Sequence, residues 1–142
     1  MELWSIEVFT DPHGFSPFES WLKSDLTPAE IAAVDLSIQK VLIPNGINLA
    51  STKWLTALGQ GLFEFRISHS AEEIAGFYAQ KGVGDGRAHP KILLRIFLHF
   101  YGEKVVLILG GYNKGQRDQK RHQQLQITEA RKLLKQWKEQ GG

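Results

Sequence analysis

The sequence predicts a small α+β sandwich, in which an N-terminal strand and a helical hairpin pack on a mainly antiparallel sheet and a C-terminal helix closes the chain. Three observations predict it. Residues 91–114 form two apolar runs joined at Gly102, which is typical of a β-hairpin. Residues 16–46 contain two helix starts in succession. Residues 119–140 repeat apolar side chains at helical spacing.

The N-terminal part predicts one strand and then the helical hairpin. Residues 3–9, LWSIEVF, alternate as a strand does, and the turn sequence DPHG ends them. Ser16 and Thr27 each precede a proline and stand three residues before a glutamate, which is the capping-box arrangement at a helix start. Residues 44–46, PNG, end the second helix. Its apolar stripe is expected to contain Ile31, Val34, Ile38 and Val41.

The C-terminal part predicts three further strands and the last helix. A connector, residues 51–59, contains Lys53 and precedes a strand at residues 61–67, GLFEFRI. Ser70 can cap a short helix that runs to Tyr78, and the glycine-rich residues 81–90 are expected to form a mobile insertion. The hairpin supplies the other two strands. The final helix is expected to cluster Ile127, Ala130, Leu133, Leu134 and Trp137.

Alternation along the strands divides the sheet into an apolar and a cationic face. Burying each large apolar side chain is worth roughly 1.5–3 kcal/mol, so the face with Phe65 and Ile96 belongs under the helical hairpin. Burying the Arg95 guanidinium without a partner costs several kcal/mol, so its face is expected to be wet or lined with anions. A wet Arg95 could be replaced without harm to the fold. This face is expected to show Glu64, Arg66, Arg95 and His99, with Lys114 and Arg117 just past the last strand.

Composition narrows the class of protein. The length of 142 residues suits one domain, and the absence of cysteine excludes disulfides, thiol nucleophiles and cysteine metal sites. The first ten residues lack the pattern of a signal peptide, and no stretch approaches the ~20 apolar residues of a membrane span, so a cytoplasmic protein is expected. Residues 1–111 hold 9 Lys/Arg against 12 Asp/Glu, net −3, and residues 112–142 hold 8 against 3, net +5. The basic C-terminal quarter favours a local anion site.

The basic residues of several elements form the candidate site. No GxGxxG before a helix, P-loop, GxSxG or HExxH spacing occurs, so neither a metal nor another cofactor is predicted. Guanidinium groups bind phosphate oxygens through two parallel hydrogen bonds and stabilise charge on a pentavalent phosphorus, which suits a phosphodiester substrate. The set comprises Lys53, Arg66, Arg95, Lys114, Arg117, Lys120, Arg121 and His122.

A purely structural interpretation of these residues stays open. Arg66 and Arg95 could each simply pair with Glu64 on the same face of the sheet. Arg117, Lys120 and Arg121 could be solvated charges, although cations at a helix start oppose the helix dipole unless an anion is bound there. His99 suits a half-exposed strand position, whereas His122 is the only histidine within the basic cluster.

In this order, the motifs resemble those of a known family. They are Lys53-Trp54-Leu55, the strand Gly61–Ile67, Arg95-Ile96-Phe97, Gly111-Tyr112-Asn113-Lys114, and Gln124-x-x-Ile127-x-x-Ala130-Arg131. Together they resemble the HigB branch of the RelE superfamily, the toxins of toxin–antitoxin modules, which includes phage-derived members. The resemblance implies one RelE/HigB-like toxin domain over residues 1–142. It also implies a metal-independent endoribonuclease (mRNA interferase) that cuts mRNA on the ribosome and is neutralised by a cognate antitoxin, which we expect to be a small helix-turn-helix protein.

The resemblance also suggests roles for individual residues. Arg66 and Arg95 match the strand cations that stabilise the phosphorane, and Lys114 matches the lysine that ends the last strand. Lys53 matches a basic position before the strand. Gly115 stands where many relatives carry a second basic residue, so Arg117 would have to replace it. The catalytic set is therefore Arg66, Arg95, Lys114 and His122, and the RNA-binding set is Lys53, Arg117, Lys120 and Arg121.

Two other functions stay open at this point. The chain could be a ParE-like interaction toxin that inhibits gyrase without catalysis, a class that resembles this fold but lacks the cationic catalytic set. It could also be a phage protein that kept the scaffold and lost the activity. Two departures from the family pattern keep these interpretations open. Gly115 replaces a basic residue, and the downstream tyrosine that some members use is absent, with Arg121 and His122 near its place.

Overall fold

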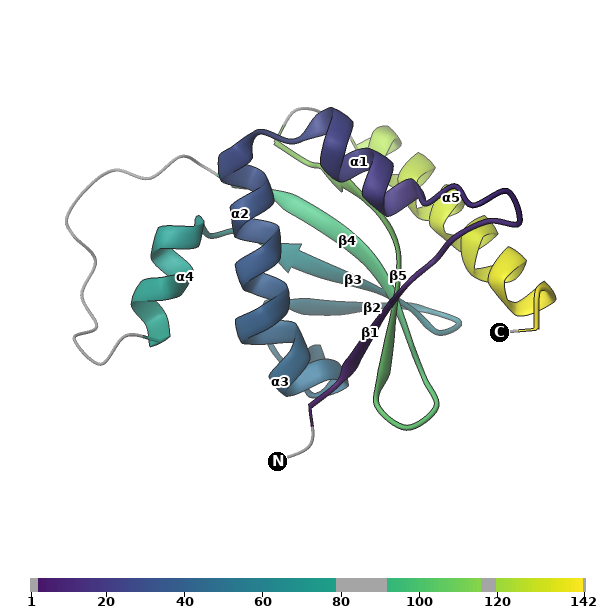
Figure 1. Cartoon of the computed structure of the whole chain (residues 1–142), viewed down its shortest axis with the longest axis horizontal. Coiled ribbons are helices and arrows are strands. Elements are labelled where there is room, and N and C mark those ends of the chain that lie inside the picture. The colour runs from purple at the N-terminus through teal and green to yellow at the C-terminus, as the bar shows by residue number, and fades with distance from the viewer. Residues whose placement is uncertain (1–2, 79–91, 116–119, 142) are drawn as a thin grey trace.

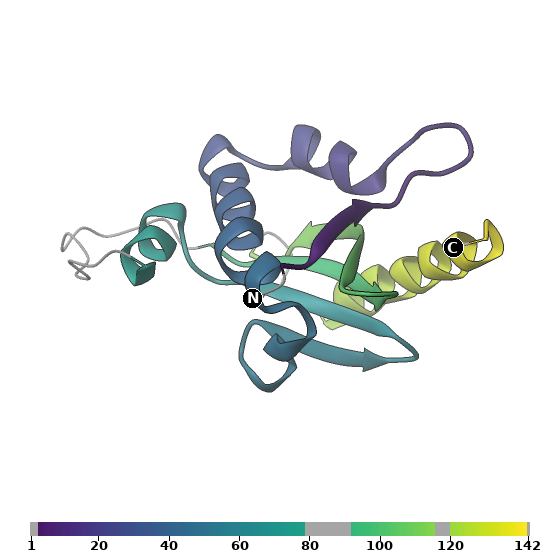
Figure 2. The same ribbon diagram turned by 60° about the horizontal axis from the view of Figure 1, so that its bottom comes forward.

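The computed structural model describes residues 3–78, 92–115 and 120–141, and it shows a five-stranded sheet with helices on both faces (Figures 1 and 2). The strand order is β1-β5-β4-β3-β2. β1 runs parallel to β5, and every other neighbouring pair is antiparallel. The α+β class, the helical hairpin and the C-terminal helix are confirmed. The strands are β1 (Ser5–Val8), β2 (Leu55–Gly59), β3 (Leu62–Ile67), β4 (Leu94–Tyr101) and β5 (Val105–Asn113).

Both predicted helix starts of the hairpin are confirmed. α1 (Pro17–Asp25) begins after Ser16, whose hydroxyl accepts a hydrogen bond from the Glu19 amide. α2 (Pro28–Ser37) begins after Thr27, and Thr27 and Glu30 form a complete capping box. A π-helical segment, η1 (Ile38–Leu42), and the short α3 (Ile43–Asn45) continue the helix, and a 3₁₀ segment, η2 (Gly46–Ser51), follows them.

The predicted apolar stripe of α2 is partly wrong. Val34 and Val41 are buried, but Ile31 is 38% exposed and lines an apolar groove together with Phe18 and Leu22 of α1. Ile31 and Val34 both lie in the regular part of α2, before the π-helical segment η1, so that segment does not set the direction of Ile31. The groove between the two helices leaves the Ile31 side chain partly open to solvent.

The sequence interpretation missed the edge strand β2, which it placed in a connector. β2 pairs with β3 through a two-residue turn at Gln60 and Gly61, both with positive φ, as a type I′ hairpin requires. The sequence Gly59-Gln60-Gly61 could have indicated this turn. The strand itself is short, lies at the sheet edge and carries an irregularity before Gly59, so its alternation is weak.

The helix predicted to follow β3 is also present. α4 (Ala71–Tyr78) begins after Ser70, whose hydroxyl accepts a hydrogen bond from the Glu73 amide. In return, the Ser70 amide donates to the Glu73 carboxylate, and this hydrogen bond holds the pKa of Glu73 below its usual value. The predicted insertion at residues 81–90 lies outside the described residues.

Helices cover both faces of the sheet. The C-terminal helix was predicted, but its position over the second face was not. The face that contains Phe65, Ile96 and Ile108 packs under α1 and α2, as expected. The opposite face, expected to be wet or lined with anions, carries α5 (Lys120–Glu139). β5 explains this arrangement, because its run VVLIL is apolar at both parities and leaves Leu107 and Leu109 to be buried on the second face. From α5, the buried side chains are those of Ala130, Leu134 and Trp137.

The close approach of α1 to β5 generates a test of this packing. A Cβ added at Gly111 would lie 2.5 Å from Cζ3 of Trp21, whereas one added at Gly110 would meet nothing nearer than 3.9 Å. We expect Gly111→Ala to lower the free energy of unfolding by about 1–3 kcal/mol in urea denaturation, because the Trp21 ring must move. Gly110→Ala is the matched control and should unfold close to the parent. Equal midpoints for the two variants would contradict this placement of α1.

Candidate functional site

Two arginines and a tyrosine form a row across three neighbouring strands. Arg66 on β3 is the register partner of Arg95 on β4, and Arg95 is in turn the partner of Tyr112 on β5. Directly paired residues share a face, so all three side chains project on the α5 side of the sheet. The prediction that Arg66 and Arg95 lie together, opposite the helical hairpin, is confirmed. We call Arg66, Arg95 and Tyr112 the cross-strand row.

The buried carboxylate of Glu64 contacts both arginines. Its Oε1 atom lies 3.1 Å from Nε of Arg66 and 3.7 Å from Nε of Arg95, and the Glu64 side chain is completely buried. Among the described residues, Glu64 Oε2 has no hydrogen-bond partner. Arg95 also donates through Nη1 to the carbonyl of Leu94 at 3.1 Å. The pairing of both arginines with Glu64, which the sequence left as an alternative, is therefore the geometry observed.

The two arginines differ in access to solvent. The Arg66 side chain is 38% exposed and uses Nε on Glu64, and its Nη atoms make no hydrogen bond within the described part of the chain. The Arg95 side chain is only 8% exposed. The Arg95 face was expected to be wet or lined with anions, and the second alternative is observed, because the buried Glu64 carboxylate lies against Arg95. Only Arg66 presents a guanidinium edge that an incoming phosphate could reach.

An aromatic chain connects the cross-strand row to α5. The Tyr112 ring stacks on the Phe97 ring with centroids 5.7 Å apart. The His122 ring lies edge-on to the Tyr112 ring, with centroids 5.8 Å apart. Tyr112 is buried and His122 half-buried. This contact brings His122, which belongs to the predicted catalytic set, beside the row. Tyr112 and Phe97 were not predicted as site residues, although both belong to motifs that the sequence interpretation quoted.

Lys114 follows β5, which contributes Tyr112 to the row, and Lys53 precedes the edge strand β2, which pairs with β3. The Lys114 amide donates to the Leu93 carbonyl, which extends the β4–β5 ladder past Asn113 and gives Lys114 the same parity as Tyr112. Lys53 is exposed and adjoins Trp54, whose carbonyl accepts from the amide of Arg66 at 2.7 Å. Both lysines are therefore anchored through the backbone to the strands that carry the row.

The other predicted cations lie at the start of α5 or outside the described residues. Lys120 and Arg121 are exposed in the first turn of α5, which contains no acidic residue. Their charges oppose the helix dipole, so a bound anion would be stabilised there. Arg117 falls outside the described residues. The structure thus brings Arg66 and Arg95 together at Glu64 and His122 beside the row at Tyr112. It places Lys114, Lys120 and Arg121 on the adjoining segments.

The remaining titratable cluster of this face lies toward the other end of α5. His99 is half-buried, and its Nδ1 lies 2.7 Å from the Gly61 carbonyl, so this nitrogen carries the proton and holds the β2–β3 turn. Tyr101 donates to the Glu7 carboxylate, and this hydrogen bond raises the pKa of the Tyr101 hydroxyl. Trp137 packs against both rings. His99 therefore has a structural role at a distance from the cross-strand row.

Searches for other features and relatives gave no match. Within the described residues, no group of three or more His, Cys, Asp or Glu side chains is arranged to hold a metal ion. None of the helices described has both the length and the apolar character that crossing a membrane requires. The chain matched no protein-family model, curated protein or solved structure with which it was compared.

The buried pair generates a stability prediction. Arg95→Ala should lower the free energy of unfolding by about 3–5 kcal/mol, because it removes one partner of a fully buried carboxylate. Arg66→Ala should cost less, since its side chain is more than a third exposed. Urea denaturation of both variants measures the difference.

A double variant provides the control for this comparison. Glu64→Gln combined with Arg95→Ala should lose less stability than the sum of the two single changes, because the neutral amide no longer needs a buried cation. An Arg95→Ala protein as stable as the parent would contradict the buried pair.

Proposed function

We propose that this chain is the toxin of a toxin–antitoxin module and acts as an mRNA interferase, an endoribonuclease that cleaves mRNA on the ribosome without a metal ion. The observation that carries the proposal is the cross-strand row. Arg66 offers an accessible guanidinium edge, and buried partners hold its strand and its Nε in place. The resemblance of the ordered motifs to HigB-like toxins supports the same assignment.

The proposed reaction is a transesterification within the RNA strand. The 2′-oxygen attacks the adjacent phosphorus and loses its proton to a base, and the bond from phosphorus to the 5′-oxygen breaks as that oxygen receives a proton. The products are a 2′,3′-cyclic phosphate and a 5′-hydroxyl. The negative charge peaks on the phosphorane, where a fixed guanidinium is most effective. All atoms balance with no added reactant.

The proposal gives the residues different roles, which the distances support. Arg66 contacts the phosphorane, while Glu64 and Arg95 act as positioning residues that fix the Arg66 side chain. His122 or Lys114 transfers protons, a contribution worth roughly 10²–10⁴-fold. Lys53, Lys120 and Arg121 bind the flanking phosphates, together with Arg117, for which the assignment rests on the sequence. Compared with the sequence interpretation, Arg95 moves from direct contact with the phosphate to positioning.

The proposal includes the partners and the compartment. The toxin binds mRNA in the ribosome, and a cognate antitoxin, a small helix-turn-helix protein, neutralises it in the cytoplasm. Both partners are proteins or assemblies encoded separately from this chain. Co-expression with the neighbouring reading frame provides a direct test of the antitoxin, because a true antitoxin restores growth.

One observation favours the second candidate function, a ParE-like toxin that inhibits gyrase without catalysis. Arg66 and Arg95 both contact Glu64, which is also what a purely structural ion-pair cluster would show. In that case the cationic surface binds a protein partner, and neither the parent nor any variant of the cross-strand row cleaves RNA. Toxicity in the absence of any mRNA cleavage would identify this function.

Replacing Arg66 tests the catalytic proposal. Arg66→Ala should slow mRNA cleavage by about 10²–10³-fold while the protein remains folded, because one preorganised donor to the phosphorane is lost. Arg66→Lys should recover little, since it keeps the charge but not the planar fork. Cleavage of a defined mRNA on ribosomes, in the Mg²⁺ that intact ribosomes require, measures both.

Lys135→Ala is the matched control, because Lys135 is an exposed cation on α5. It should cleave as the parent does. A folded Arg66→Ala protein with full activity would overturn the proposed site.

The basic surface generates a separate prediction for RNA affinity. If Lys114, Arg117, Lys120 and Arg121 each neutralise one phosphate, the log–log dependence of affinity on salt should have a slope of about −3, from about −0.7 per contact on a single strand. Lys120→Ala should make the slope shallower by about 0.7 and leave the cleavage step nearly unchanged. Filter binding of a single-stranded RNA at several salt concentrations provides the measurement, and a salt-independent affinity would contradict the RNA interface.

A further inference from the structure

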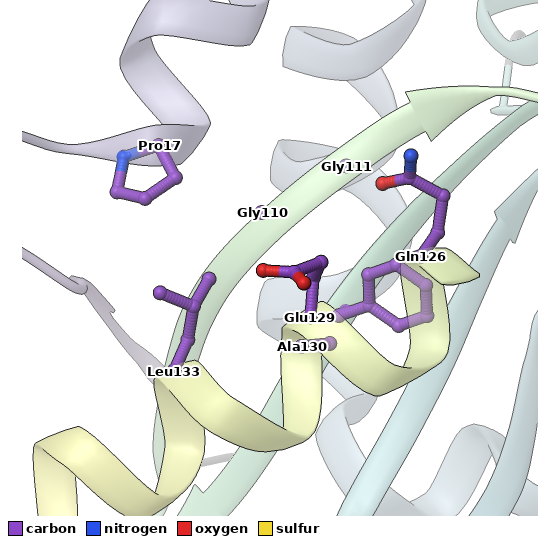
Figure 3. Close-up of a pocket in the computed structure, with 8 residues that line it drawn as sticks. Pro17, Gly110, Gly111, Gln126, Glu129, Ala130 and Leu133 are labelled. Carbon is purple, nitrogen blue, oxygen red and sulfur yellow. The ribbon is translucent and has the colours of Figure 1, made fainter. Parts of the chain in front are cut away.

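A pocket of about 200 Å³ lies between the start of α1, strand β5 and helix α5 (Figure 3). Its walls include the apolar side chains of Pro17 and Leu133, and the ring of Phe97 contributes to its lining. The volume is below the roughly 300–1,000 Å³ typical of pockets for drug-sized ligands, so one heterocyclic ring system suits it better than a larger molecule.

The absence of a side chain at Gly110 keeps this pocket open. A Cβ built there lies 3.9 Å from Cδ1 of Leu133 and 4.0 Å from Cβ of Pro17, so a methyl group would occupy space between the two walls without a clash. Gly110→Ala is therefore a conservative way to narrow the pocket. It is also the change that we expect to leave the stability of the fold nearly unaltered.

Two polar side chains of α5 define what the pocket can recognise. Gln126 and Glu129 are three residues apart, hence neighbours on the helix surface, and both line the pocket (Figure 3). An ionised glutamate only accepts hydrogen bonds, whereas the glutamine amide both donates and accepts. The complementary ligand edge has adjacent N–H donors for the carboxylate and an oxygen acceptor for the amide.

We propose that this pocket binds a guanine base of the RNA substrate, an inference that rests on the proposed function. Guanine presents N1–H and N2–H side by side next to O6, which matches Glu129 and Gln126. Adenine presents the bare N1 acceptor to the carboxylate, and cytosine presents one amino group. RNA-binding proteins read such Watson–Crick edges on unstacked bases. The pocket would then determine the sequence preference of cleavage.

The pocket adjoins the proposed cleavage site. Phe97 follows Arg95 by two residues on the same face of β4, a separation of about 7 Å along the strand. The Phe97 ring also stacks on Tyr112 of the cross-strand row. A single RNA strand can therefore contact Arg66 with a phosphate while a neighbouring base enters the pocket.

The existing partner of Glu129 does not block this role. Its carboxylate contacts Nζ of Lys132 at 3.3 Å, and both side chains are more than half exposed. Exposed pairs of this kind are weak. A base that offers two hydrogen bonds can therefore compete for the carboxylate, and Lys132 remains beside it.

Nucleotide binding tests the pocket without requiring cleavage. Guanosine 5′-monophosphate should shift the amide resonances of Gly110 and Gly111 in a titration followed by NMR, with an affinity about tenfold or more above that of adenosine 5′-monophosphate. Glu129→Gln and Gly110→Ala should remove this preference. Glu139→Gln, at the far end of the same helix, is the control and should retain it. Equal responses to the two nucleotides, or an unchanged preference in Glu129→Gln, would overturn the pocket.

Mapping of cleavage sites separates this inference from the proposed function. On a mixed-sequence RNA, the parent should cut at a fixed distance from guanine, and Glu129→Gln should lower that preference about tenfold while total cleavage persists. Cleavage without any guanine preference would overturn the pocket and leave the mRNA interferase standing. Selective, Glu129-dependent binding of the guanine nucleotide without cleavage of any RNA would uphold the pocket as a guanine site and overturn the proposed function.

Discussion

The second face of the sheet depends on one buried carboxylate. Glu64 is completely removed from solvent, and a charge of this kind requires compensating charge in contact with it. Arg66 supplies part of that charge from the same strand, and Arg95 supplies more from the neighbouring strand. A slip of one residue between β3 and β4 would turn Arg95 toward the hydrophobic core under α2 and leave the carboxylate with a single cation. The ion pairs therefore help to fix the register of these two strands.

This arrangement also explains how one arginine can be reactive beside another that is structural. An exposed arginine on a free strand end would lose much side-chain entropy when it bound a phosphate. Arg66 is already held through Nε, so part of that entropy is lost during folding and the Nη atoms remain available. Arg95, with its carbonyl and carboxylate contacts, is committed to the interior. Preorganisation of this type is what makes a donor effective toward a short-lived anion.

Local chemistry made much of the fold predictable from sequence. The caps at Ser16, Thr27 and Ser70 and the turn at Gly102 are decided within a few residues, and all four lie where expected. Features decided by distant contacts were not predictable in this way. The covering of the second sheet face depends on where α5 packs, and the exposure of Ile31 depends on how α1 and α2 lie against each other. Parity placed Arg66 and Arg95 together, but it could not show how accessible each would be.

Because α5 follows all five strands in the sequence, its position has a consequence for synthesis. N-terminal segments of a chain generally fold first as they emerge from the ribosome. Here β1 can pair only when β5 has been made, and Leu62, Phe97 and Leu107 have no helix over them until α5 follows. A nascent chain that stops before α5 therefore exposes an apolar sheet face, which is a target for chaperones and a risk for aggregation. Because α5 also carries His122, this histidine comes to lie beside Tyr112 of the cross-strand row in the same late step that buries this face.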